Sequence, residues 1–221
     1  MTTNKIKSLF QRGKKSIGEK GLFLFLRHLL LHHVVHCIYE NNLNGPFFPC
    51  RVNNAQLKII SSAGEFDYLL EKGFDFMEFP VEVQEGFPID IQEYKKRLEK
   101  GAVLFCLLCN GDVAHTSWVG FSEGAFRDFY PFSPENSSAG YTGGTITASK
   151  YRRRGINLYI HSEIFQYLKK RKKSKALAAV RKENMVARHS QEKLGSYIKE
   201  EKHELRLLLF FSFKWSRPHF S

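Results

Sequence analysis

An asparagine–glycine dipeptide between two apolar runs is the feature that most restricts how this chain can fold. Residues 102–109 (AVLFCLLC) and 113–121 (VAHTSWVGF) flank Asn110-Gly111. This dipeptide suits a two-residue turn with positive φ at both centres, and such a turn joins two antiparallel strands. The first run is apolar throughout, which is typical of a buried strand. The sequence therefore predicts an antiparallel hairpin that contains a buried strand.

Helices and further strands are predicted on both sides of this hairpin. Within residues 89–100, Ile91, Tyr94 and Leu98 recur at helical spacing, and Gly101 ends the helix. The other predicted elements are a helix at 63–72, an edge strand in 74–83 interrupted at Pro80, a loop at 126–140, a strand at 141–148, a helix at 151–172, a strand at 176–180, a helix at 184–194 and a final long strand within 204–215. This order predicts an α/β fold, with a mixed, mainly antiparallel sheet flanked by helices.

Residues 1–45 are expected to form a basic and apolar helical appendage, and residues 46–221 the main domain. Residues 1–20 show helical apolar spacing with a basic opposite face. Residues 21–39 are apolar, but Arg27 and four histidines interrupt them, so neither a membrane-spanning helix nor a secretory signal is expected. We therefore expect a cytoplasmic chain whose appendage packs on the main domain. The alternative is peripheral contact of residues 1–40 with the inner face of an anionic membrane.

Two groups of potential metal ligands are predicted to be structural. The first group is His28, His32, His36 and Glu40, spaced four residues apart. In a helix each such step turns about 40° beyond a full turn, so the outer members diverge. The second group, Cys106 and Cys109, falls on a predicted strand, where residues three apart point to opposite faces. We expect no metal site, and we expect the cysteines to be core thiols of a reducing compartment.

The formal net charge of +12 indicates anionic partners, such as a nucleotide cofactor, a phosphorylated substrate, nucleic acid or an acidic membrane. The basic run at residues 169–175 (KKRKKSK) lies at the end of a predicted helix, where cations complement the helix dipole. No aromatic residue is interleaved with this run, so it is predicted to be a solvated surface and no nucleic-acid partner is expected.

The strongest candidate for a binding site is the junction between the strand at 141–148 and the helix that follows. It reads TITASKYRRRGIN, from Thr145 to Asn157. A helix N-terminus presents unpaired backbone N–H groups and a partial positive charge, which together attract anions. Gly155 lets the backbone approach a phosphate closely, and the arginines at 152–154 add positive charge. The alternative interpretation is a solvated basic turn that caps a helix.

This junction resembles the acyl-CoA loop of the GNAT (GCN5-related) N-acetyltransferase superfamily, which has the pattern Arg/Gln-x-x-Gly-x-Gly/Ala. Arg152 matches the first position and Gly155 the central glycine. Asn157 departs from the small last residue of the pattern.

A second segment is similar to the N-x-x-(A/S)…K-L-G-F helix of the same superfamily. Asn184 and Ala187 match its first half, and residues 193–195 (KLG) match its second half. Ser196 stands where the family usually has an aromatic residue. The two motifs occur in the family's order with a strand between them, and the resemblance covers residues 88–215.

The resemblance implies a sheet that splays between the strands at 141–148 and 176–180, with acetyl-CoA or another acyl-CoA in the splay. Pantetheine would hydrogen-bond to the backbone of residues 145–147, and the pyrophosphate would lie on the amides of residues 153–157. Asn184 would contact the pantetheine arm or order the next helix. The residues implied to bind the cofactor are Thr145, Ile146, Thr147, Arg152, Arg153, Arg154, Gly155, Ile156, Asn157 and Asn184.

The acid and base of such a reaction are harder to place. In many family members a tyrosine seven residues after the asparagine protonates the leaving thiolate, but here that position is Gln191, which cannot act as an acid. His115 and Tyr141 are the candidate bases, and the alternative for each is a core or pocket-lining role.

The resemblance implies an N-acyltransferase that moves an acetyl or other acyl group to an amine. The excess of positive charge suits a small anionic acceptor, and an amino sugar or nucleotide sugar is expected by analogy alone. The rival hypothesis is a non-catalytic protein of the same fold that binds an anionic membrane or nucleic acid through residues 1–40 and 169–175. The acyl length and the oligomeric state stay open.

Overall fold

The computed structural model of the protein describes residues 31–76, 91–127, 130, 132, 138–207 and 211–218. The chain divides into two compact units, one of residues 38–199 and one that combines residues 1–37 with residues 200–221. The larger unit holds nearly all of the predicted elements.

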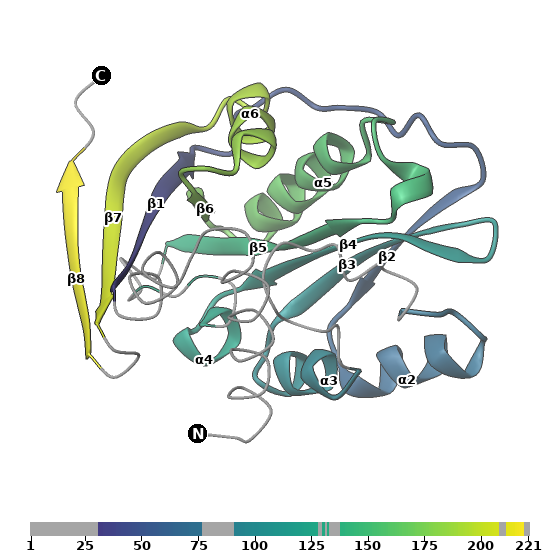
Figure 1. The fold of residues 1–221 in the computed structure, drawn as a ribbon. Coiled ribbons are helices and arrows are strands. Elements are labelled where there is room, and N and C mark those ends of the chain that lie inside the picture. Colours follow the sequence, from purple (N-terminus) through teal and green to yellow (C-terminus); the bar gives the residue numbers. More distant parts are fainter. Residues whose placement is uncertain are drawn as a thin grey trace, which may run out of the picture. The chain divides into compact units, whose positions relative to one another are not determined.

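The described elements are strands and helices interspersed along the chain (Figure 1). They are β1 (Leu31–Asn41), β2 (Ala55–Ile60), α2 (Ala63–Glu71), α3 (Ile91–Glu99), β3 (Val103–Cys109), β4 (Asp112–Gly120), α4 (Glu123–Phe126), β5 (Ala139–Thr147), the 3-10 turn η1 (Ser149–Tyr151), α5 (Ile156–Lys170), β6 (Lys175–Arg181), α6 (Met185–Lys193), β7 (Tyr197–Leu207) and β8 (Phe211–Pro218). The strands are hydrogen-bonded in the order β2-β3-β4-β5-β6-β1-β7-β8. β5 and β6 run parallel, whereas β2–β3, β3–β4, β4–β5 and β7–β8 are antiparallel pairs. The predicted α/β class with a mixed, mainly antiparallel sheet is confirmed.

The hairpin predicted from Asn110-Gly111 is β3–β4. Both turn residues have positive φ, 50° at Asn110 and 85° at Gly111, as a tight turn of this kind requires. Every residue of β3 is buried. The buried strand and the turn are therefore where the sequence predicted them.

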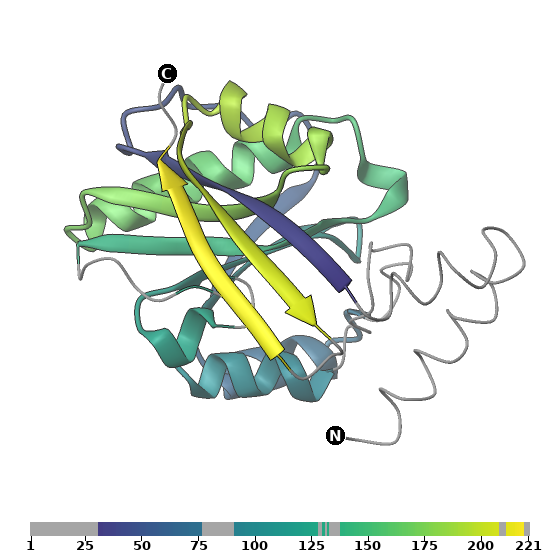
Figure 2. The ribbon, with the colours of Figure 1, turned by 60° about the vertical axis from the view of Figure 1, so that its left-hand side comes forward.

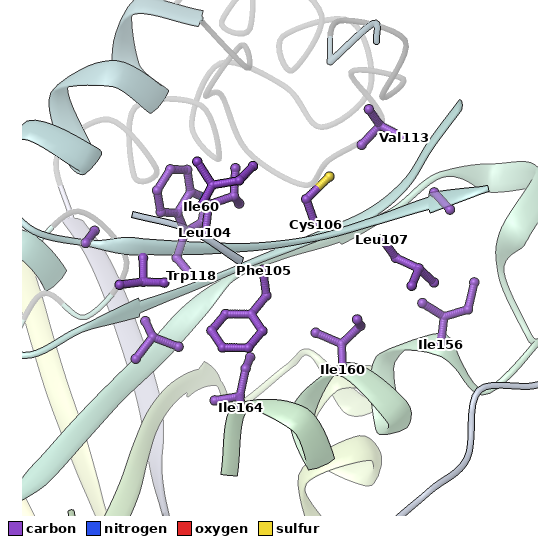
Figure 3. Close-up of a cluster of buried hydrophobic side chains, with 14 of the residues drawn as sticks. Ile60, Leu104, Phe105, Cys106, Leu107, Val113, Trp118, Ile156, Ile160 and Ile164 are labelled. Carbon is purple, nitrogen blue, oxygen red and sulfur yellow. The ribbon is translucent and has the colours of Figure 1, made fainter. Parts of the chain in front are cut away.

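Helices cover both faces of the sheet in the larger unit (Figure 1). Along β3 the side chains alternate, so Phe105 and Leu107 point to the face covered by α5, where Ile160 lies, and Cys106 points to the opposite face (Figure 3). On that opposite face Tyr94 of α3 packs edge-on against Trp118 of β4, with 4.9 Å between the ring centroids. These two layers of apolar contacts hold α3 and α5 against the sheet.

The cysteine interpretation agrees with this alternation. Cys106 and Cys109 are both buried, and all four cysteines carry free thiols. Burial raises the pKa of the Cys106 thiol, so the thiolate that reacts with metals and oxidants is disfavoured. Within the described ranges, no group of three or more histidine, cysteine or acidic residues is placed to hold a metal ion.

The helical structure expected for the appendage at 1–45 is wrong from Leu31 onward, because residues 31–41 form strand β1. The part of the expected appendage at residues 1–30 lies outside the described residues. β1 takes a place inside the strand order, between β6 and β7, and its last residues belong to the larger unit. The β-branched residues Val34, Val35 and Ile38 favour a strand, and the helical spacing of His32, His36 and Glu40 has no meaning there.

The final strand predicted within 204–215 is two strands. β7 and β8 pair antiparallel, with His203 opposite Trp215, and the connection at 208–210 lies outside the described residues. In the smaller unit β1, β7 and β8 lie side by side (Figure 2). The rings of His33, His203 and Trp215 stack there, with centroid distances of 5.0 to 5.6 Å.

Other boundaries shift by a few residues. The helix expected at 151–172 begins at Ile156, after the turn η1, and ends at Lys170. The edge strand expected in 74–83 is absent from residues 74–76, and residues 77–83 lie outside the described residues, as does most of the loop at 126–140. Among the helices of the described segments, none is long and apolar enough to cross a membrane.

Candidate functional site

The parallel strands β5 and β6 separate partway along their length. They pair from Ala139 opposite Lys175 to Thr142 opposite Ala178. β5 then continues to Thr147 and β6 to Arg181, but the two strands are no longer paired. Among the strands that the structure describes, residues 143–147 of β5 therefore pair on the β4 side alone, and Gly144 and Thr145 are exposed. The splay implied by the resemblance is present, and it leaves strand backbone available to a ligand.

A bulge in β5 lies at this splay. Thr116 pairs with Ile146 and Trp118 with Gly143, so two residues of β5, Gly144 and Thr145, lie opposite one residue of β4. Gly144 has a φ of 57°, which glycine adopts without strain. A bulge leaves its extra residue out of the ladder and bends the strand. The bulge thus turns the end of β5 away from the regular sheet.

The end of β5 leads through η1 to an N-terminus of α5 that has no side-chain cap. Gly155 is the N-cap residue, and its φ of 74° is one that favours glycine. A Cβ atom at Gly155 would meet no atom within 4 Å, so the space beside it is open. The first-turn N–H groups of α5 therefore lack a capping oxygen from Gly155 and point out of the helix. This is the backbone arrangement that binds anions.

The cations of this loop are held in different ways. The Nε atom of Arg152 donates a hydrogen bond to the carbonyl oxygen of Thr147 at 3.1 Å. The guanidinium of Arg154 lies over the ring of Tyr151, 5.7 Å from its centroid. Arg153 is exposed and has a positive φ of 62°, which is uncommon for a residue with a side chain. The three arginines directly precede Gly155, the N-cap of α5, in the chain.

Asp112, at the start of β4, fastens the loop to the hairpin. Lys150 forms a 2.7 Å ion pair with Asp112. The single proton of the Tyr151 hydroxyl faces two acceptors, Asp112 Oδ2 at 2.9 Å and the carbonyl oxygen of Cys109 at 3.1 Å. The hydrogen bonds from Lys150 and Tyr151 hold the pKa of Asp112 below its ordinary value. The sequence analysis missed this anchor, because Asp112 is distant from the loop in sequence.

Asn184 has a local structural role. It is the N-cap of α6, and its Oδ1 atom accepts a hydrogen bond from the backbone N–H of Ala187 at 3.1 Å. Of the two roles that the resemblance implied, the ordering of the next helix is therefore present in the structure.

Gln191, at the position of the family's tyrosine, is buried in a polar network. The Ser196 hydroxyl donates a hydrogen bond to Gln191 Oε1 at 3.1 Å, and Asn41 Nδ2 donates one to Ser196 Oγ at 3.1 Å. Ser196, which stands where the family has an aromatic residue, completes this network. Through Ser196, Gln191 thus links α6 to Asn41 of β1.

The two candidate bases are buried. His115 has no exposed surface, and its Nδ1 atom lies 2.8 Å from Thr147 Oγ1. Burial, aided by the neighbouring His161, lowers the pKa of His115 to about 3, so its imidazole is neutral at physiological pH. The Tyr141 ring is 1% exposed and stacks on Phe126 at a centroid distance of 4.0 Å. The catalytic assignment of both residues stays a prediction, and each would have to act from inside the core.

The structure places an aromatic pair beside the basic run at 169–175. The Arg171 guanidinium lies 5.2 Å from the centroid of the Tyr167 ring and 5.9 Å from that of Phe121, and Lys173 lies 5.3 Å from the Phe121 ring. Lys175 forms a 2.9 Å ion pair with Glu40. The sequence analysis missed Phe121, because it is 50 residues away from Arg171 in the chain.

At the level of sequence, no protein-family model matches the chain, and no curated protein does. Solved structures do resemble it. An acetyltransferase from the GNAT family of Colwellia psychrerythraea gives a TM-score of 0.53 at 13% identity and matches 85% of this chain and 60% of its own. A GCN5-related N-acetyltransferase from Sphaerobacter thermophilus gives a TM-score of 0.51 at 14% identity. The match covers 85% of this chain and 56% of that structure's chain. A functionally unknown conserved protein from Staphylococcus epidermidis gives a TM-score of 0.50 at 12% identity. The match covers 86% of this chain and 68% of that structure's chain.

These similarities establish the fold. The chain has the fold of the GNAT superfamily, as the two sequence motifs implied. It spans 56% to 68% of the length of these three structures, and identities of 12% to 14% carry no information on substrate or acceptor.

Proposed function

We propose that the protein is an N-acyltransferase that moves an acetyl or other acyl group from acyl-CoA to an amine. The observation that carries this proposal is the separation of β5 from β6 directly beside the uncapped N-terminus of α5. The splay offers strand backbone to an elongated amide-containing arm, and the helix N-terminus offers N–H donors to phosphates. Acyl-CoA has both parts in one molecule.

The residues present fit such a co-substrate. The backbone of Thr145, Ile146 and Thr147 would take the pantetheine arm, because this part of β5 is unpaired on the β6 side. The amides of residues 153–157 would take the pyrophosphate, and open space beside Gly155 allows a phosphate to come close. The net charge of +12 favours a ligand this rich in phosphate.

The acyl transfer proceeds without a covalent bond to a side chain of the protein. The amine nitrogen attacks the thioester carbonyl carbon, a C–N bond forms, the C–S bond breaks, the amine gives up a proton and the leaving thiolate accepts one. The thioester supplies the activated acyl group. This chain would supply orientation and hydrogen-bond donors to the carbonyl oxygen, which are the two effects that most lower such a barrier.

The acceptor that we propose is a small anionic amine, with amino sugars and nucleotide sugars as the first candidates. Positive charge on the loop at 150–154 would attract an acceptor that carries phosphate. The rival is a non-catalytic protein of the same fold that binds an anionic membrane or nucleic acid. The buried Gln191 in place of a tyrosine is the feature that favours the rival.

Release of free thiol from acetyl-CoA in the presence of amine acceptors tests the proposal. The panel contains amino sugars and nucleotide amino sugars, and the Gly155→Glu variant is the control. We expect acceptor-dependent thiol release by the wild-type protein and its loss in the variant, because the glutamate places bulk and negative charge where the phosphates bind. If the wild-type protein binds vesicles or nucleic acid but neither binds nor turns over acyl-CoA, the rival is correct.

A further inference from the structure

The smaller unit contains a pair of histidines that joins two neighbouring strands. His33 Nε2 of β1 lies 3.1 Å from His203 Nδ1 of β7, which is a hydrogen-bonding distance between residues 170 positions apart in the sequence. β1 and β7 are neighbours in the strand order and lie side by side (Figure 2). The proposed acyl-CoA site uses neither histidine, so the pair has a separate role.

The number of protons that this contact tolerates follows from imidazole chemistry. The two facing nitrogens lie closer together than the ring centroids, which are 5.3 Å apart, so they point toward each other. A hydrogen bond between them needs an N–H on one nitrogen and a lone pair on the other. A neutral pair meets this condition, and so does a pair in which one ring is an imidazolium. When both rings are imidazolium, both facing nitrogens carry N–H and the hydrogen bond is lost.

Trp215 and Glu201 favour the first added proton. Trp215 stands opposite His203 in the β7–β8 ladder, and its ring centroid lies 5.0 Å from that of His203 and 5.6 Å from that of His33. The face of an indole ring attracts a cation. Glu201 Oε2 lies 3.9 Å from His203 Nε2, the nitrogen that does not face His33. A pair with one positive charge is therefore stabilised by its surroundings.

The second added proton is disfavoured. It places two positive rings in contact, and like charges at this distance repel each other. Within the β7–β8 ladder at 200–207 and 211–218, the charged residues on the face of His203 are Glu201 and Arg217, which stand opposite each other. Arg217 adds a second cation to this face, and one carboxylate cannot balance it and two imidazolium rings.

The titratable groups of β1 near His33 do not change this balance. Side-chain alternation along the strand places His36 on the opposite face and Cys37 on the face of His33. Cys37 carries a free thiol, which is uncharged in acid. The charge on this face therefore depends on the two imidazoles as the pH falls.

We propose that the His33–His203 pair is a pH-sensitive switch, which joins β1 to β7 while the two rings together carry at most one positive charge and releases them when both rings are charged. Release loosens β1 from β7 and removes the imidazoles from the Trp215 ring. The switch responds to acidification and not to a ligand. It is independent of the proposed acyl transfer, because none of these residues belongs to the acyl-CoA site.

The test is a titration of the full-length protein by NMR from about pH 8 to about pH 4, which brackets the usual range of histidine. Imidazole nitrogen shifts report the protonation of each ring, and the indole N–H resonance reports the surroundings of Trp215. Backbone amide exchange, corrected for its intrinsic pH dependence, reports the contact between β1 and β7. His33→Phe keeps an aromatic ring but removes the hydrogen bond and the charge, and His189→Phe, at an exposed position of α6, is the matched control.

In the wild-type protein we expect the pair to titrate in two steps at least about one pH unit apart, because the first charge opposes the second. At the second step the Trp215 resonance shifts, and the amides of β1 and β7 lose protection. In His33→Phe, His203 titrates in a single step and the loss of protection in acid is smaller. His189→Phe behaves like the wild-type protein.

Two results overturn the proposal. If both histidines titrate in single, independent steps in the wild-type protein, the two rings do not share a proton. If they titrate in two steps but the amides of β1 and β7 stay protected through the second, the rings are coupled and do not act as a switch. Both results are read from the wild-type protein, so they decide the matter even if His33→Phe does not fold.

Discussion

Asn41 donates a hydrogen bond from Nδ2 to the carbonyl oxygen of Leu194 at 2.9 Å, across 153 residues of sequence. Asn41 ends β1, and Leu194 is the C-cap of α6. Asn41 also donates to Ser196 Oγ and accepts from the backbone N–H of Leu43 at 2.7 Å. The N-terminal strand is therefore fastened to the end of the second GNAT-like motif, and it is part of the folded core.

Asn41→Ala is expected to reduce the free energy of unfolding by about 1 to 3 kcal/mol, because it removes the side chain that bonds to the carbonyl oxygen of Leu194 and to the backbone N–H of Leu43. Asn42→Ala is the matched control, since Asn42 is exposed, and it should change stability little. Urea unfolding monitored by circular dichroism measures both. Equal midpoints for the two variants would contradict the structural role of Asn41.

Deletion of residues 1–45 is expected to yield a chain that does not fold cooperatively. The deletion removes β1, including the buried residues Cys37, Ile38 and Tyr39. A cooperative unfolding transition at the wild-type temperature would show that these residues are the separable appendage expected from the sequence.

Glu40 should make the stability of the protein depend on pH in the acid range. Burial opposes the charged form, but hydrogen bonds from Tyr197 at 2.6 Å and Lys175 at 2.9 Å outweigh it and lower the pKa of Glu40. A lowered folded-state pKa stabilises the protein above the unfolded value of 4.5 and loses this effect as pH falls through the folded value. We expect Glu40→Gln to be less stable than wild type at pH 7 and to approach it near pH 3. The exposed Glu99→Gln serves as the control, and a constant difference across pH would contradict the prediction.

Tyr197 should make stability depend on pH in the alkaline range, where stability falls as pH rises. Its hydrogen bond to Glu40, with burial second, raises the pKa of Tyr197 to about 12. Stability is therefore fully present below the unfolded value of 10 and declines as pH rises toward 12. Spectroscopic titration of tyrosinate, compared between wild type and Tyr197→Phe, should show that one tyrosine ionises late, near pH 12. If the ionisation that the variant lacks falls near pH 10 instead, Tyr197 does not bond to Glu40 in solution.

His115 should contribute a pH dependence to stability and none to turnover. Burial lowers the pKa of His115 from an ordinary 6.5 to about 3. Below pH 6.5 the imidazole is therefore protonated in the unfolded chain but stays neutral in the folded chain. Stability should thus fall as pH drops through 6.5, and His115→Leu should weaken this fall. The rate of acyl transfer should show no inflection from His115 between pH 6 and 9. If His115→Asn abolishes turnover at unchanged acyl-CoA affinity and stability, His115 takes part in catalysis.

The strongest local signals in the sequence predicted their elements well. Asn110-Gly111 indicated a tight turn, because both residues readily adopt the positive φ that such a turn requires. The spacing of Ile91, Tyr94 and Leu98 indicated α3. Both signals are local, so no distant partner had to be known. The junction of β5, Gly155 and α5 was predictable for the same reason, because its three parts are adjacent in the chain.

β1 and the roles of single site residues could not be predicted in this way. An apolar run fits a helix or a strand, and β1 is a strand because β6 and β7, more than 130 residues later, provide its partners. His115 reads as a possible base in the sequence, and only the packed structure shows that it is fully buried. The three arginines are equivalent in sequence, whereas Thr147 and Tyr151 distinguish them in space.

The central claim is that this loop binds acyl-CoA, and the melting temperature with and without acetyl-CoA tests it most directly, in wild type and in Gly155→Glu. Ligand at about 100 times its dissociation constant adds about 2.7 kcal/mol to stability, which raises the melting temperature of a chain this long by several degrees. We predict this rise in the wild-type protein and its absence in Gly155→Glu. No rise with acetyl-CoA or longer acyl-CoAs, or an equal rise in the variant, would contradict the claim.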